Sequence, residues 1–209
     1  MKNSLEVDFV IFDLGNVIID IFYPETLDYI KSKVAPTHQE KVATFYQTDF
    51  HKDYEKGLIT SIAFRDQVRA YFEEDWSDEF VDFLWNYLLG KIPSDRLKLV
   101  EELKKKYQVG ILSNTNEIHI NAVNEILNRD HDIESLDRIF DHIYFSHHMN
   151  LAKPDSLIYQ KMIADLNTTP ERVLFFDDLK NNVDGAKSLG IQAYQVTSPQ
   201  VIFDFFKNV

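Results

Sequence analysis

Short runs of mainly apolar residues recur along this 209-residue chain, and stretches with helical periodicity separate most of them. Runs of this kind are typical of strands that are buried on both faces, as the strands of parallel sheets are. The runs are residues 9–12, 108–112, 139–145, 172–176 and 192–196. Their alternation with helices predicts the α/β fold class, with a doubly wound, Rossmann-like parallel sheet.

The region between the first two predicted strands differs from the rest because its patterns are helical. Those patterns cover residues 24–34, 37–56, 61–73 and 77–89. The simplest interpretation is a helical subdomain inserted after the first strand. We therefore expect residues 1–19 and 93–209 to form the α/β core, and residues 20–92 to form a helical cap.

Polar side chains follow three of the predicted strands at the point where each strand ends. Asp13 follows the first strand, Ser113 follows the second, and Asp177 with Asp178 follows the fourth. Ligands bind at the carboxyl ends of parallel strands, so we expect these residues to converge although they are far apart in sequence. Adjacent carboxylates such as Asp177 and Asp178 repel each other unless a cation lies between them. The alternative is a solvated turn in which Asp178 caps a helix, but together with Asp13 the pair favours Mg²⁺.

The remaining candidates have side chains suited to a phosphate or to a metal. Asp13 can ligate a cation or attack phosphorus, and Gly15 leaves room for a close approach of the backbone. Ser113 and Asn114 are short hydrogen-bonding residues that can hold phosphate oxygens, or else cap the helix that follows. Lys153 is either a solvated surface cation or the fixed positive charge that a metal-phosphate site needs.

The charge balance excludes several classes of partner. A formal net charge of −12 disfavours a broad nucleic-acid surface and an anionic membrane surface, whereas a small anionic substrate needs only a local cation. The chain has no Cys, which excludes disulfides, thiolate zinc sites and cysteine nucleophiles. Because Asp13 and Asp20 interrupt the early apolar stretch, we expect no signal peptide or membrane span and a cytoplasmic location. The oligomeric state leaves no signal in the sequence.

The ordered set of motifs resembles the haloacid dehalogenase-like hydrolase superfamily, most of whose members are Mg²⁺-dependent phosphatases. The motifs are Asp13-Leu14-Gly15-Asn16-Val17, Ile111-Leu112-Ser113-Asn114, Lys153-Pro154, and Phe176-Asp177-Asp178 followed by Asn182-Val183-Asp184-Gly185-Ala186. Their order and spacing fit across nearly the whole chain, with residues 20–92 in the place of that superfamily's helical cap. The first two motifs are most similar to those of bacterial sugar-1-phosphate phosphatases of the α-D-glucose-1-phosphatase type.

The resemblance implies hydrolysis of a small phosphorylated metabolite, such as a sugar phosphate, through an aspartyl-phosphate intermediate. It implies that Asp13 is the nucleophile, and that Lys153 pairs with the phosphoryl group and keeps Asp13 ionised. The implied Mg²⁺ ligands are Asp13, the Gly15 carbonyl, Asp178 and, directly or indirectly, Asp177. The implied contacts to phosphoryl oxygens come from Ser113, Asn114 and Lys153.

One position departs from the family pattern. Most family phosphatases carry a second Asp two residues after the nucleophile, where it serves as general acid and base. This chain has Gly15 there. Three outcomes stay open: slow catalysis, a leaving group that needs little protonation, or replacement by another group, for which Asp20 is near in sequence only. Two other functions also stay open, a metal-independent dehalogenase of the same fold and a non-catalytic module that binds a phosphorylated ligand.

Overall fold

The computed structural model describes residues 6–207, which are built around a five-stranded parallel sheet. The strands are β1 (Phe9–Phe12), β2 (Gln108–Ser113), β3 (His142–Phe145), β4 (Val173–Asp177) and β5 (Gln192–Gln195). They lie in the order β3-β2-β1-β4-β5, so the predicted doubly wound α/β sheet is confirmed. Phe12 is in register with Ile111 on β2 and Phe176 on β4, and the carboxyl ends of these three strands therefore meet at one edge.

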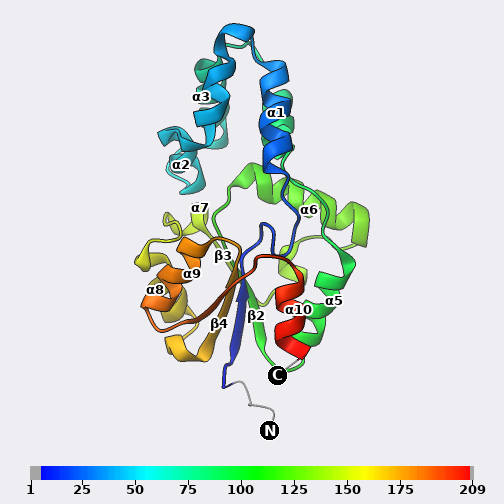
Figure 1. The fold of residues 1–209 in the computed structure, drawn as a ribbon, viewed down its shortest axis with the longest axis vertical. Coiled ribbons are helices and arrows are strands. Elements are labelled where there is room, and N and C mark those ends of the chain that lie inside the picture. The colour runs from blue at the N-terminus through cyan, green and yellow to red at the C-terminus, as the bar shows by residue number, and fades with distance from the viewer. Residues whose placement is uncertain (1–5, 208–209) are drawn as a thin grey trace.

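Helices cover both faces of the sheet (Figure 1). On one face lie α5 (Ser94–Leu103), α6 (Glu117–His131) and α10 (Gln200–Lys207). On the other lie α8 (Ser156–Asp165) and α9 (Lys180–Ser188), and a single turn, α7 (Ser146–Met149), follows β3. Each face has its own apolar cluster, because the continuous apolar strands present side chains to both sides.

The inserted region consists of helices that stand over the carboxyl edge of the sheet (Figure 1). Its elements are α1 (Tyr23–Lys33), a 3₁₀ segment (Pro36–Gln47), α2 (Asp49–Glu55), α3 (Ser61–Phe72) and α4 (Asp78–Asn86). They enclose a separate apolar cluster around the fully buried Phe64 and the buried Trp85. The chain enters and leaves this region through two segments joined by an antiparallel bridge between Ile21 and Leu89. We refer to this region as the cap, and its exact boundaries stay a prediction.

The sequence pattern predicts one continuous helix over residues 37–56, and this expectation is wrong. Thr48 has an extended backbone with φ −63° and ψ 151°, which separates the 3₁₀ segment from α2. Tyr46 and His51 lie on either side of this break, with ring centroids 5.4 Å apart, and both line the same cavity. Among the described residues, no helix is both long enough and apolar enough to cross a membrane.

Candidate active site

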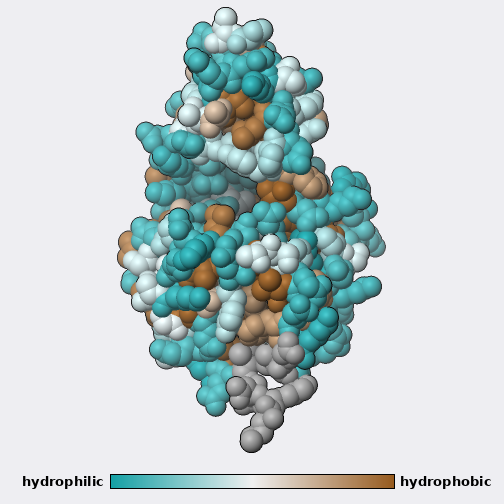
Figure 2. Space-filling model, viewed as in Figure 1, coloured by the Kyte–Doolittle hydropathy of each residue, from teal (hydrophilic) through white to brown (hydrophobic). Residues whose placement is uncertain are grey.

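A cavity of about 490 Å³ lies at the carboxyl edge of the sheet, beneath the cap. The surface is hollowed at this junction (Figure 2). Core residues from the loops after β1, β2 and β4 line its floor, and residues of the cap line its roof. The floor residues include Asp13, Gly15, Ser113, Asn114, Lys153 and Asp178, which are sequence-predicted site residues.

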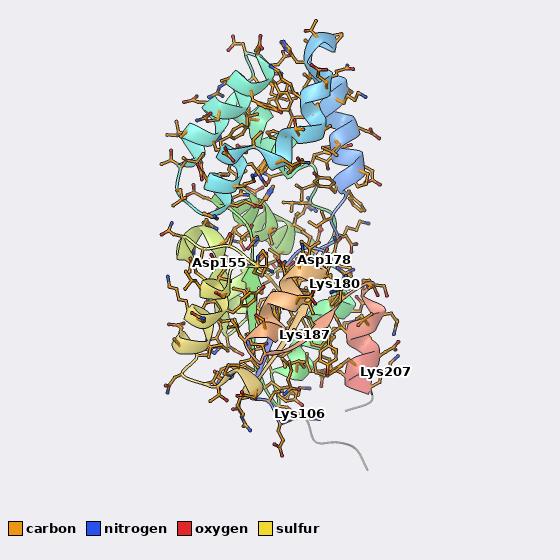
Figure 3. The ribbon with its side chains drawn as sticks, turned by 60° about the vertical axis from the view of Figure 1, so that its left-hand side comes forward. Lys106, Asp155, Asp178, Lys180, Lys187 and Lys207 are labelled. Carbon is orange, nitrogen blue, oxygen red and sulfur yellow. The ribbon has the colours of Figure 1, made fainter. Side chains whose placement is uncertain are left out.

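Three carboxylates meet at the floor of this cavity. Asp13 directly follows β1, Asp177 ends β4, and Asp178 lies where the core faces the cap (Figure 3). One carboxylate oxygen of each lies within 4.8 Å of the others. Asp177 is fully buried and Asp13 is 8% exposed. Such a concentration of negative charge is costly without a cation, and its all-oxygen donor set suits Mg²⁺.

Lys153 supplies one positive charge to this cluster. Its Nζ donates to Asp13 Oδ1 (2.8 Å), Asp177 Oδ2 (2.6 Å) and the Leu112 carbonyl (2.7 Å). Burial raises the pKa of Asp13 to about 6, and Asp177 adds to this rise while Lys153 opposes it. Burial acts to lower the pKa of Lys153, but the two carboxylates outweigh burial and raise it. The Lys153 side chain is therefore held as a buried cation between two acids.

The oxygens of Asp177 are occupied by protein donors. Oδ1 accepts from the Leu179 N–H (2.8 Å) and from Asn182 Nδ2 (3.0 Å). Oδ2 accepts from Lys153 Nζ (2.6 Å) and again from Asn182 Nδ2 (3.1 Å). Asp178 Oδ2 accepts from Asn16 Nδ2 (2.9 Å). These contacts leave Asp13 Oδ2 and Asp178 Oδ1 without a protein donor among the described residues.

Asn114 is in the predicted place, but its side chain contacts Lys153. Asn114 Oδ1 accepts from the Lys153 N–H (2.8 Å), and Nδ2 donates to the Lys153 carbonyl (2.9 Å). This reciprocal pair ties the loop after β2 to the loop that carries Lys153. Ser113 is buried beside it and lines the cavity.

Asp20 does not line the cavity. Its Oδ1 accepts from Arg96 Nη2 at 2.6 Å, and its backbone pairs with Gly90 and Lys91 at the cap junction. The geometry therefore gives Asp20 a structural role at this junction and does not support it as a replacement for the acid that Gly15 lacks.

The cap also contributes polar and aromatic groups to the site, to which the sequence pattern did not assign His51, Glu55 or His119. Tyr46, His51, Glu55 and Trp85 line the cavity from the cap, and His119 lines it from α6. Trp85 stacks on His119 with ring centroids 4.8 Å apart. Burial lowers the pKa of His51 to about 4 and that of His119 to about 3, so both rings are neutral at pH 7. Aromatic residues at helical spacing indicate a packed core, and only the tertiary structure shows that some of them face a cavity.

The family model for haloacid dehalogenase-like hydrolases matches residues 7–190. The chain belongs to this family. The predicted resemblance is therefore confirmed, and so is the expectation that the chain is a hydrolase.

Three proteins resemble this chain in sequence or in structure. D-ribitol-5-phosphate phosphatase of Bacteroides thetaiotaomicron is 27% identical over 189 residues, which cover 89% of this chain and 90% of that protein. The crystal structure of HAD family enzyme BT-2542 from the same organism, in complex with magnesium and inorganic phosphate, superposes with a TM-score of 0.82 and 32% identity. That match covers 90% of this chain and 93% of the other. A crystal structure of L-2-haloacid dehalogenase from Xanthobacter autotrophicus shares the fold, with a TM-score of 0.62 and 18% identity. The match covers 90% of this chain and 77% of that chain.

Proposed function

We propose that this family member is a Mg²⁺-dependent phosphatase that hydrolyses a small phosphorylated sugar or polyol through an aspartyl-phosphate on Asp13. Its enzyme class is that of a phosphoric monoester hydrolase. The observation that carries the proposal is the group of the buried Asp13, Lys153 and Asp177 with the half-buried Asp178 at the floor of a cavity. The phosphatase name of the Bacteroides relative and the magnesium and phosphate in the BT-2542 structure support it.

The free carboxylate oxygens determine which residues would hold Mg²⁺. Asp13 Oδ2 and Asp178 Oδ1 have no protein donor among the described residues, and Gly15, whose carbonyl is the further candidate ligand, lines the same cavity. Because both oxygens of Asp177 already accept two hydrogen bonds, Asp177 would act indirectly, by holding Lys153. The bound ion supplies charge neutralisation for the phosphoryl group.

The chain's own residues account for the transfer step. Asp13 attacks phosphorus, and Lys153, held between Asp13 and Asp177, keeps the attacking carboxylate ionised and attracts the phosphoryl oxygens. The Ser113 hydroxyl holds a phosphoryl oxygen. Asn114 does so through its main-chain N–H, because its side chain is engaged with Lys153.

Polar groups of the cavity wall suit a substrate that carries hydroxyl groups. Asn16, Thr115 and Glu55 line the cavity beside its apolar side chains. The Bacteroides relative is named for the phosphate of a polyol, D-ribitol, which supports the same substrate class. A panel of phosphorylated sugars and polyols, assayed with Mg²⁺, tests this preference, and we expect kcat/KM to be higher for polyhydroxylated substrates than for propyl phosphate.

One assay separates this proposal from the two alternatives. We expect 4-nitrophenyl phosphate to be hydrolysed with Mg²⁺ and not after its removal by a chelator. Release of chloride from 2-chloropropionate without Mg²⁺ would support the dehalogenase, although Asp177 and Asp178 would repel such a carboxylate. Mg²⁺ binding without turnover of any phosphoester would support the binding module.

Replacing Asp178 with Asn tests the metal assignment. We expect the Mg²⁺ concentration for half-maximal activity to rise about 10-fold to 100-fold, as seen when groups around a metal are altered. Isothermal titration with Mg²⁺ measures the affinity directly. Asp184→Asn on α9 is the matched control, because Asp184 is exposed and pairs with Lys180. Equal Mg²⁺ affinity of the Asp178 variant and the wild type would contradict the assignment.

A further inference from the structure

The proposed phosphatase lacks a proton donor at the position where its family usually has one. An alkoxide leaving group is very basic, so cleavage of an alkyl phosphate gains about 10²-fold to 10⁴-fold from a positioned acid. Gly15 has no side chain, and Asp20 is paired with Arg96 outside the cavity. A replacement must therefore come from another residue of the cavity wall.

The titratable groups of the cavity wall narrow the choice. In the described part of the chain they are Asp13, Tyr23, Tyr46, His51, Glu55, His119, Lys153 and Asp178. Asp13 is the nucleophile, Asp178 faces the proposed metal, and Lys153 donates to three acceptors.

The rings of the wall are also poor donors. Burial raises the pKa values of Tyr23 and Tyr46 above the usual range, so neither phenol changes protonation state near neutral pH. The His51 and His119 rings are neutral for the reason given above, and His119 Nδ1 lies 2.9 Å from Asn86 Oδ1.

We propose that Glu55, at the end of cap helix α2, is the general acid and base of this enzyme. The inference rests on the proposed phosphatase function. Glu55 lines the same cavity as Asp13 but belongs to the cap, so its carboxylate can serve the leaving group of a phosphate ester held between the core and the cap. Its carboxylate makes no hydrogen bond with another described side chain, and His51 Nε2 lies 3.6 Å from Glu55 Oε1.

Three contacts fasten the end of α2 to the core. Ser146 Oγ donates to the Glu55 carbonyl (2.5 Å) and accepts from the Thr115 N–H (2.9 Å), which ties Glu55 to the loop that follows Ser113. Asn150 Nδ2 donates to the Lys56 carbonyl at 2.8 Å. These bonds fix the backbone of Glu55 relative to the carboxylate cluster, although the residue belongs to the cap.

Gly57 provides the third contact because it packs directly on the core backbone. It has φ +65°, and a Cβ there would lie 2.1 Å from the His147 carbonyl oxygen. Only glycine permits both the left-handed conformation and this close approach. The turn after Glu55 is thus built to dock on α7.

The electrostatic surroundings fit a group that both gives and takes a proton. Burial raises the pKa of Glu55 to about 7, with Asp13 adding to the rise and Lys153 opposing it. His51 and Tyr46 also face Glu55 from the cap, and neither carries a charge near pH 7. Both protonation states are therefore accessible at neutral pH.

The proton transfers balance over the two steps. In the first, the Asp13 carboxylate forms a bond to phosphorus, the bond from phosphorus to the leaving oxygen breaks, and protonated Glu55 gives that oxygen its proton. In the second, the Glu55 carboxylate takes a proton from water, whose oxygen bonds to phosphorus while the bond to Asp13 breaks. Inorganic phosphate leaves, and Asp13 and Glu55 return to their initial states.

Glu55→Gln tests the assignment with two substrates. With ribitol 5-phosphate, whose alkoxide needs a proton, we expect kcat to fall about 10²-fold or more. With 4-nitrophenyl phosphate, whose leaving phenolate needs none, we expect a burst of nitrophenolate equal to the enzyme concentration at near the wild-type rate. Slow turnover follows, because water lacks its base, and the phosphorylated enzyme accumulates and is detected by mass spectrometry after an acid quench.

The controls separate this inference from the proposed function. Asp53→Asn, on the same helix but outside the cavity, should match the wild type with both substrates. Absence of turnover by the wild type would overturn the phosphatase proposal and this inference with it. A Glu55→Gln enzyme that keeps the wild-type rate with ribitol 5-phosphate, or that shows no burst and no phosphoenzyme, overturns the role of Glu55 while the wild-type activity still stands.

Gly57→Ala tests how Glu55 is positioned. The added Cβ must displace the turn from His147, so we expect a smaller loss with ribitol 5-phosphate than in Glu55→Gln, and the burst with 4-nitrophenyl phosphate retained. Gly190→Ala is the control, because Gly190 also has a positive φ (+89°) but contacts Pro170 and Glu171. Both variants share the conformational penalty of a side chain at positive φ. If Gly57→Ala and Gly190→Ala changed the ratio of the rates with the two substrates equally, the result would argue against a role of Gly57 in positioning Glu55.

Discussion

An Asp13→Asn enzyme should lose turnover of every phosphate ester by about 10⁴-fold or more, because the amide cannot form the covalent intermediate. The expected result is the same for 4-nitrophenyl phosphate and for ribitol 5-phosphate, since the nucleophile is needed whatever the leaving group. Rapid-quench mass spectrometry should detect no phosphorylated protein. A variant that retains the wild-type rate would contradict the assignment of the nucleophile.

The stability of this variant should move in the opposite direction from its activity. Burial raises the pKa of Asp13 from 3.8 to about 6, so at pH 7 the folded state carries a desolvated charge that the unfolded chain solvates freely. A group with a raised pKa in the folded state destabilises it above that pKa, and this effect fades as pH falls from about 6 toward 4. In metal-free buffer we expect Asp13→Asn to be at least as stable as the wild type at pH 7, with the advantage lost near pH 4.

Replacing Lys153 with Met should damage stability and activity together. Lys153 is the buried cation between Asp13 and Asp177, and its removal leaves two buried carboxylates facing each other. Breaking a buried ion pair from one side costs about 3–5 kcal/mol. The variant also loses the positive charge that attracts the phosphoryl group, so we expect kcat/KM to fall by about 10²-fold to 10³-fold. Urea unfolding and steady-state kinetics measure the two effects.

Two comparisons show whether the loss arises from uncompensated charge. Lys180→Met, at an exposed pair with Asp184, should change the free energy of unfolding by less than about 1 kcal/mol. The double variant Lys153→Met with Asp177→Asn should recover part of the stability, because one of the two buried charges is gone, and it should stay inactive. A double variant no more stable than Lys153→Met alone would show that lost packing, and not charge, is responsible.

The core of the site could be predicted because sheet geometry is regular. Continuous apolar runs identify buried parallel strands, and parallel strands place the residues after their carboxyl ends at one edge. Asp13, Ser113 and Asp178 lie at that edge as expected, and Lys153 lies between two of the acids. These residues come from segments up to about 160 residues apart in sequence, yet the period and order of the strands are enough to bring them together.

The hydrogen-bond partners of the residues at that edge could be assigned only from the structure. The sequence predicts that Asn114 contacts the phosphate and leaves open whether Asp177 binds the metal directly or acts indirectly. The structure shows that Asn114 bonds to the backbone of Lys153, and that Asp177 is saturated by donors. Hydrogen-bond partners of this kind are set by loop conformations, for which a residue pattern carries no signal.

The residue pattern was enough to predict the α/β core, the polar residues that follow its strands and the helices of the inserted region. The pattern could not show which cap side chains face the cavity. Helical periodicity separates a buried face from an exposed one, but it does not tell whether a buried side chain packs inside the cap or faces the sheet. The break at Thr48 and the docking of Gly57 on His147 decide this. The packing of the cap on the core brings Glu55 into the same cavity as Asp13, from where we propose that it replaces the carboxylate that Gly15 lacks.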